Sequence, residues 1–133
     1  MDNKRIELLK DYIKYGKAPI LVENIPSSVF DMAIVLDATC PMEDLNGHYE
    51  GVNFLPPKWY EDLMIKSKQG RPVLLIQQIN KVEAQQQKKF IEILKYKKIS
   101  TFDLPEDCLI VVTANNIEKS KIDEEVYSLL AHI

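Results

Sequence analysis

The chain has 133 residues, of which 46% are hydrophobic and 28% are charged, and its formal net charge is −3. This length and composition predict one soluble globular domain over residues 1–133. The net acidity argues against nucleic acid as the main partner, and no apolar run approaches the roughly 20 residues of a membrane span, so we expect a cytoplasmic protein without membrane contact.

The two cysteines, Cys40 and Cys108, are too few for a disulfide framework. With only two histidines in the chain, no cysteine and histidine set has the spacing of metal ligands. We therefore expect free, buried or half-buried thiols and no metal site.

A first helix is predicted for residues 2–15. Ile6, Leu9 and Ile13 recur at helical spacing and form one apolar face. Gly16 follows, as is typical of a helix end.

Two strands follow, at residues 19–23 and 32–37, because both segments are short apolar runs. The connection between them, residues 24–31, has room for about one helical turn, whereas a parallel crossover usually takes about a dozen residues or more. This connection is unusually short for a parallel sheet.

Residues 38–69 are rich in proline and glycine and predict an insertion dominated by loops, where binding segments often lie. Within it, residues 57–64 predict a helix that starts at a proline. Trp59 and Leu63 should face inward.

A strand buried on both faces is predicted at residues 72–76, ending in Gln77 and Gln78. Asn80 is placed to cap a helix over residues 81–98, whose spacing gives one apolar stripe and exposed lysines.

The last part of the chain predicts a loop or small hairpin at residues 99–107 and a further buried strand at 108–114, followed by Asn115. Ser120 and Asp123 have the spacing of a capping box that opens a final helix. Alternating strands and helices predict a parallel α/β sheet of about four strands with helices on both faces. Ligands of such sheets bind at the carboxyl ends of the strands.

Several sequence segments over residues 19–133 occur in the order found in one protein family. They are "VLDATC", "EDLNGHYEG", "PPKWYEDL", "VLLIQQINKV", "FIEILKYKKI", "LPEDC" and "LIVVTANN". This combination resembles the core of MoxR-like AAA+ ATPases. The resemblance implies a P-loop NTPase-like three-layer sandwich, truncated so that the family's fifth strand and lid domain lie beyond residue 133.

The chain departs from that family where the chemistry would reside. The phosphate loop of the family should fall at residues 23–31, which contain neither glycine nor lysine. Gln77 and Gln78 stand where the family has two acids, one for Mg²⁺ and one for the attacking water. An amide is no general base, a loss of about 10²–10⁴-fold for that role. No arginine follows the fourth strand.

The resemblance therefore implies a degenerate AAA+ core with no catalytic residues, no metal and no cofactor. Six positions are remnants of the nucleotide site: Asn24, Ser27, Ser28, Gln77, Gln78 and Asn115. We expect a catalytically inactive module that acts through protein contacts, with an intact AAA+ ATPase subunit or with itself. The candidate contact residues are Tyr49, Trp59, Lys88 and Lys95.

Two alternatives stay open. The first is an unusual nucleotide-binding or ATPase domain that holds ATP and Mg²⁺ with Glu23, Asp37 and Asn115 at the strand ends. The second, weaker alternative is a nucleic-acid accessory protein that uses the lysine face with Tyr96, against which the net acidity argues.

Overall fold

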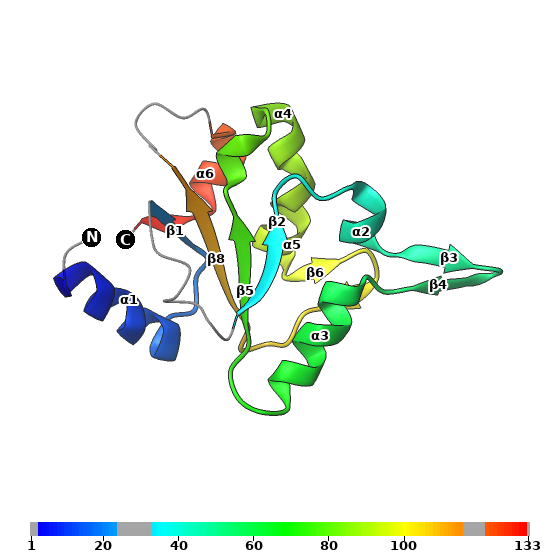
Figure 1. Ribbon diagram of the computed structural model, residues 1–133, viewed down its shortest axis with the longest axis horizontal. Coiled ribbons are helices and arrows are strands. Elements are labelled where there is room, and N and C mark those ends of the chain that lie inside the picture. The colour runs from blue at the N-terminus through cyan, green and yellow to red at the C-terminus, as the bar shows by residue number, and fades with distance from the viewer. Residues whose placement is uncertain (1–2, 24–32, 116–121, 133) are drawn as a thin grey trace.

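The computed structural model describes residues 3–23, 33–115 and 122–132. Its centre is a five-stranded parallel sheet with the strand order β2-β5-β8-β1-β9 (Figure 1). The strands are β1 (Ile20–Glu23), β2 (Ile34–Asp37), β5 (Val73–Gln77), β8 (Leu109–Ala114) and β9 (Ala131–His132). The prediction of about four strands was one too few, and the expectation that the fifth strand lies beyond residue 133 was wrong. The fifth strand, β9, has only two residues, too few to show a strand pattern in the sequence.

The central strand is β8, in which all six residues are buried. It pairs with β5 on one side, with Leu74 opposite Ile110, and with β1 on the other, with Leu21 opposite Val112. Continuous burial on both faces is what the apolar runs predicted, because each face of a parallel sheet is covered by helices.

One face of the sheet is covered by α1 (Asn3–Tyr15), as the helical spacing predicted. Leu9 is fully buried there. It belongs to a small core whose other buried members come from the sheet: Ile20, Val22, Leu75, Leu109 and Val111. Gly16 ends the helix and donates its amide to Tyr12 O at 2.7 Å.

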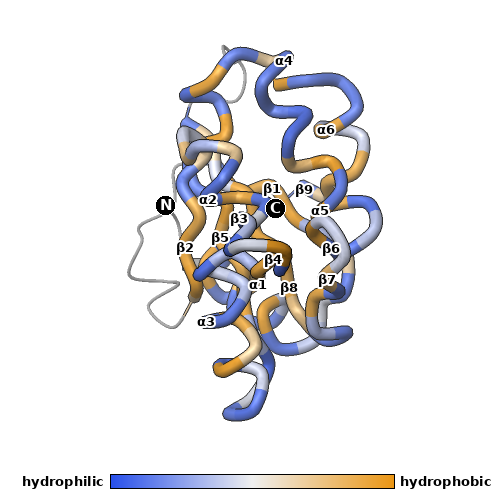
Figure 2. Tube along the Cα trace, turned by 90° about the vertical axis from the view of Figure 1, so that its right-hand side faces the viewer, coloured by the Kyte–Doolittle hydropathy of each residue, from blue (hydrophilic) through white to orange (hydrophobic). Residues whose placement is uncertain are grey.

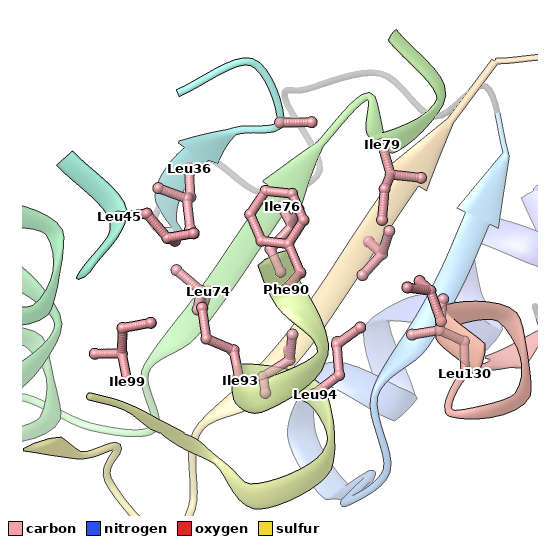
Figure 3. Packing of buried hydrophobic residues seen from close by; sticks show 14 of the residues in the cluster. Leu36, Leu45, Leu74, Ile76, Ile79, Phe90, Ile93, Leu94, Ile99 and Leu130 are labelled. Carbon is pink, nitrogen blue, oxygen red and sulfur yellow. The ribbon is translucent and has the colours of Figure 1, made fainter. Parts of the chain in front are cut away.

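The opposite face carries the larger core, which Figure 3 shows with Phe90, Ile93 and Leu94 packed over Leu74 and Ile76 of β5. The helix predicted over residues 81–98 is divided into four short pieces. These are η2 (Ile79–Lys81), α4 (Ala84–Gln87), η3 (Lys88–Phe90) and α5 (Ile91–Tyr96).

The first division has a local cause, because Val82 and Glu83 are extended, with ψ of 157° and 152°. The buried Gln87 side chain holds this break, since its Nε2 donates to Val82 O at 3.1 Å. Glutamine is a good helix former, so its sequence pattern gives no sign of this role.

The insertion at residues 38–69 is more regular than its loop-rich composition predicted. It holds α2 (Met42–Asn46), an antiparallel hairpin of β3 (His48–Glu50) and β4 (Asn53–Leu55), and α3 (Lys58–Ser67). The hairpin projects from the body of the molecule (Figure 1). Gly47 joins α2 to the hairpin with φ of 102°, and a Cβ there would lie 2.4 Å from Leu55 O, so only glycine fits.

The end of the chain folds as a second hairpin, a strand and a short helix. Strands β6 (Lys98–Ile99) and β7 (Phe102–Asp103) form the small hairpin predicted as one of two possibilities. Helix α6 (Glu124–Ser128) is capped by Asp123, whose carboxylate accepts from the amides of Glu125 and Val126. The capping-box prediction was therefore wrong about Asp123, which is the cap itself, and Ser120 lies outside the described residues.

The hydrophobic stretches gather in the strands at the middle of the molecule (Figure 2). Cys40 is half-buried and Cys108 is buried, and both are free thiols, as expected. Among the helices of the described residues, none combines the length and apolar character that a membrane crossing requires.

Candidate functional site

The carboxyl ends of the sheet strands bring together the polar residues that the sequence singled out. Asp37 ends β2 directly opposite Gln77, which ends β5, and Glu23 ends β1 opposite Ala114 of β8. The remnant positions Asn24, Ser27 and Ser28 lie outside the described residues.

Gln77 and Gln78 are built into the frame of the fold at this edge. Gln77 O accepts the amide of Ala38 at 3.1 Å and so extends the pairing of β5 with β2. Gln78 has left-handed backbone angles, φ 57° and ψ 57°, which are uncommon outside glycine. The backbone N–H of Gln78 donates to Thr113 Oγ1 at 3.0 Å, a contact that joins the end of β5 to β8.

The side chain of Gln78 is a different matter. In the part of the chain that the structure describes, its Oε1 is buried and has no hydrogen-bond partner. A buried acceptor without a hydrogen bond costs about 1–3 kcal/mol, so this oxygen is suited to accept a hydrogen bond from a water molecule or a ligand.

Asn80 and Asn115 form a reciprocal pair across the same edge. Asn80 Nδ2 donates to Asn115 O at 2.6 Å, and Asn115 N donates to Asn80 Oδ1 at 3.2 Å. The sequence predicted that Asn80 caps the following helix, and this prediction was wrong. The side-chain amide of Asn80 is instead held by Asn115, in the loop after β8. Helix α4 begins instead after Glu83, which makes no side-chain capping bond.

Asp37 is held in a tight turn by its neighbour. The amide and hydroxyl of Thr39 both donate to Asp37 Oδ1, at 2.8 and 2.5 Å. These two bonds lower the pKa of Asp37, against an opposing effect of burial and with help from the charges of Lys81 and Lys89. A carboxylate used in this way is typical of a turn former.

The chemistry available at this edge is that of neutral amides with two separate carboxylates, Glu23 and Asp37. Over residues 3–23, 33–115 and 122–132, no group of three or more histidine, cysteine, aspartate or glutamate side chains could hold a metal ion. Amides can orient a ligand by hydrogen bonds, but they supply neither a general base nor an anionic metal ligand.

The four candidate contact residues lie in three different settings. Tyr49 is 72% exposed on β3, and Lys95 is exposed on α5, with its Nζ 5.5 Å from the centre of the Tyr96 ring. Lys88 lies 3.6 Å from Asp123 Oδ2, so it is engaged within the fold. Trp59 is only 7% exposed and donates its indole N–H to Leu45 O at 3.0 Å. Trp59 is therefore a core residue that joins α3 to α2, and it is not available to a partner.

A row of aromatic rings connects the hairpin to the body of the molecule, and the sequence did not predict it. Tyr49 meets Phe54 edge to face at 4.9 Å, and Phe54 stacks on Phe102 at 5.8 Å. Phe102 in turn contacts Tyr60 at 5.4 Å. Polar and apolar residues alternate in His48–Glu50 and again from Asn53 to Phe54, on either side of a turn that contains Gly51. This pattern is the sequence signal that would have revealed the hairpin.

Comparisons with known proteins bear on the fold. A scan against protein-family models finds no match, and no curated protein matches the chain. Among solved structures, a proposed ATPase from Cytophaga hutchinsonii is similar, with a TM-score of 0.59 and 14% sequence identity. The similarity covers 98% of this chain and 45% of that one, so the chain spans less than half the length of its structural neighbour. The chain thus has an α/β fold of the P-loop NTPase-like kind, with helices on both faces of a parallel sheet, as predicted.

Proposed function

We propose that this chain is a catalytically inactive AAA+-like module that works through protein contacts. The observation that carries the proposal is the state of the β5 end. There, neutral Gln77 and Gln78 are tied into the backbone of neighbouring strands. An ATPase needs acids at this point for Mg²⁺ and for the attacking water, and an amide supplies neither.

The β3–β4 hairpin is the contact surface that the geometry favours. Val52 at its tip is 94% exposed and Tyr49 is 72% exposed, while the aromatic row fixes the hairpin against Phe102 and Tyr60. Exposed apolar side chains on a firmly held element are well suited to bind a partner, because little conformational entropy is lost on association. The proposed partner is an intact AAA+ ATPase subunit or a second copy of this chain.

A nucleotide-binding domain of unusual design is the second candidate function, and one observation favours it. The buried, unpartnered Oε1 of Gln78 is an acceptor at the carboxyl edge, where ligands of parallel sheets bind. In this alternative, Asn115 and Gln78 would orient a bound ligand by hydrogen bonds.

Calorimetric titration with ATP and Mg²⁺ separates the two functions. The inactive module gives no heat from binding at the carboxyl edge, whereas micromolar affinity there would overturn the first proposal. ATP hydrolysis that is lost in Gln78→Ala, and retained in the exposed control Gln85→Ala, would establish the second.

The contact function is tested with the double variant Tyr49→Ser/Val52→Ser. The first partner to try is an AAA+ ATPase encoded by a neighbouring gene, with sedimentation velocity of the mixture and of this chain alone. We expect the double variant to lose this association. The control is Leu8→Ser, at a residue of α1 that is 56% exposed and lies outside the hairpin, and it should associate like the unaltered chain. Equal association in all three proteins would exclude the hairpin as the contact surface.

A further inference from the structure

A pocket of about 710 Å³ lies at the amino ends of the strands, the edge opposite the candidate site. It is lined by residues 14–17, Arg71, Lys97, Glu106 and Asp107. These come from the end of α1, the segments that precede β5 and β8, and the segment after α5. Its volume is within the range of small-molecule sites, roughly 300–1,000 Å³.

Arg71 joins the walls of this pocket. Its guanidinium donates to three backbone carbonyls on separate segments, those of Ile13, Gly16 and Asp107. Two of these bonds satisfy carbonyls at the end of α1, which would otherwise present negative partial charge to the pocket. The pocket is therefore held in shape by a side chain that also removes an obstacle to anion binding.

The charge of Arg71 is left without a direct counter-ion. Its partners are neutral carbonyls, and within the described ranges no carboxylate lies within ion-pair distance of it. An ionised guanidinium with neutral partners keeps a positive potential at the site, which attracts anions.

The lysines of the pocket add to this potential. Lys97 is fixed by its left-handed backbone, with φ of 52°, and by donation of its Nζ to Glu106 O at 2.9 Å. Lys14 and Lys17 are exposed, and in residues 3–23, 33–115 and 122–132 no group hydrogen-bonds or ion-pairs with either ammonium. Four cationic and two anionic side chains line the pocket, a local excess of two positive charges. The chain as a whole has the opposite sign, with a formal charge of −3.

We propose that this pocket binds a small phosphorylated molecule. The ammonium groups of Lys14 and Lys17 act as point charges, which suit a tetrahedral phosphate. The Arg71 fork, which would recognise a planar carboxylate in two-point contact, is already used by the backbone carbonyls. The ring of Tyr15, which is 77% exposed at the pocket, is available to pack against the organic part of the ligand. The inference does not depend on the function proposed above, because the pocket and the carboxyl edge are at opposite ends of the strands.

The test uses inorganic pyrophosphate as the probe, followed by the amide NMR spectrum of the labelled protein. We expect saturable shifts confined to Gly16, Lys17, Arg71 and Asp107. The double variant Lys14→Ala/Lys17→Ala should weaken binding by at least about tenfold, because it removes two charge-assisted contacts. Both lysines are exposed, so this variant should keep its fold, which circular dichroism checks.

The matched control is Lys81→Ala/Lys95→Ala, which changes the net charge equally at exposed residues outside the pocket. Equal weakening in the control, or shifts that spread over all lysines without saturation, would overturn the proposal. Citrate serves as the carboxylate probe, and binding of citrate as tight as that of pyrophosphate would overturn the assignment to phosphate. ATP titrations repeated in Lys14→Ala/Lys17→Ala separate binding at this pocket from binding at the carboxyl edge.

Discussion

Asp37 is the carboxylate at the strand ends whose environment is most fully defined, and its pKa depends on one neighbour. Because Thr39 donates two bonds to it, the folded protein holds the pKa of Asp37 below its ordinary value. A depressed folded pKa gives a stabilising contribution that is present above the unfolded pKa and is lost as the pH falls through the folded pKa.

Replacing the hydroxyl of Thr39 should therefore move this titration. In Thr39→Val the backbone bond remains and the side-chain bond, the largest cause of the shift, is lost, so the pKa of Asp37 should rise towards its ordinary value. The carbon NMR signal of the Asp37 carboxyl group, followed through an acid titration, measures the change. Thr101→Val, at an exposed threonine elsewhere, should leave the titration unaltered. An unchanged Asp37 pKa in Thr39→Val would contradict this account.

The two thiols should differ in reactivity. Burial raises the pKa of both thiols, that of Cys108 to about 11. Cys108 is fully buried, whereas Cys40 is only half-buried. Because the thiolate is the reactive form, iodoacetamide at mildly alkaline pH should label Cys40 much faster than Cys108 in the native protein. Mass spectrometry of digested samples gives both rates, and unfolding in concentrated urea should make them similar. Equal native rates would show that the chain opens readily at Cys108, immediately before β8.

The residues at the strand ends show how far a sequence alone can lead. The positions of Gln77, Gln78 and Asn115 followed from two apolar runs, because parallel strands place their carboxyl ends at one edge. The roles of Gln78 and Asn80 did not follow. The left-handed backbone of Gln78 and the pairing of Asn80 with Asn115 depend on contacts 35 residues apart in the chain, and local preferences carry no record of such contacts.

At the scale of elements, α1 is attached to the sheet by packing on one side and by Arg71 at its end. Substituting Arg71 by alanine removes three bonds to backbone carbonyls and should lower the free energy of unfolding by about 2–3 kcal/mol. Urea denaturation measures the loss, and hydrogen exchange should show the last turn of α1 opening first.

Two companion variants sharpen this prediction about Arg71. Arg71→Lys should recover less than half of the loss, because one ammonium cannot reach three carbonyls in a fixed fork. Lys68→Ala, at an exposed residue nearby in the chain, should change stability by no more than about 0.5 kcal/mol. Full recovery by lysine would mean that the charge matters more than the geometry.

The elements differ in how well the sequence predicted them, and the reason is the range of the interactions that define them. Helix α1 follows from the helical spacing of its apolar residues, strands β5 and β8 follow from continuous apolar runs, and the structure confirms all three. The break of the predicted helix over residues 81–98 depends on Gln87 reaching Val82 O and Asp123 N, the latter at 2.8 Å from another element. The β3–β4 hairpin is held against the body of the molecule by the contact of Phe54 with Phe102. Neither contact has a local pattern.

At the scale of the whole molecule, one sheet separates two cores of unequal size. The smaller one contains Leu9 of α1, and the larger one contains Trp59, the single tryptophan of the chain. The fold class was predictable because alternation of strands and helices leaves few arrangements, but the strand order and the short β9 come from pairing between distant segments.

This arrangement predicts that a change in the smaller core is reported by a probe in the larger one. Leu9→Ala should lower the free energy of unfolding by about 2–5 kcal/mol, because Leu9 is fully buried and alanine leaves a cavity. If the sheet makes the two cores one cooperative unit, Trp59 fluorescence and far-ultraviolet circular dichroism should shift to the same lower urea midpoint. Leu8→Ala on the same helix, at a residue 56% exposed, should change the free energy of unfolding by no more than about 0.5 kcal/mol, whichever signal reports it.

An unchanged fluorescence midpoint beside a lowered dichroism midpoint would mean that α1 unfolds separately. The pocket at its end would then be a site whose affinity is set by how often α1 is in place, since a ligand that binds only the folded arrangement stabilises it by mass action.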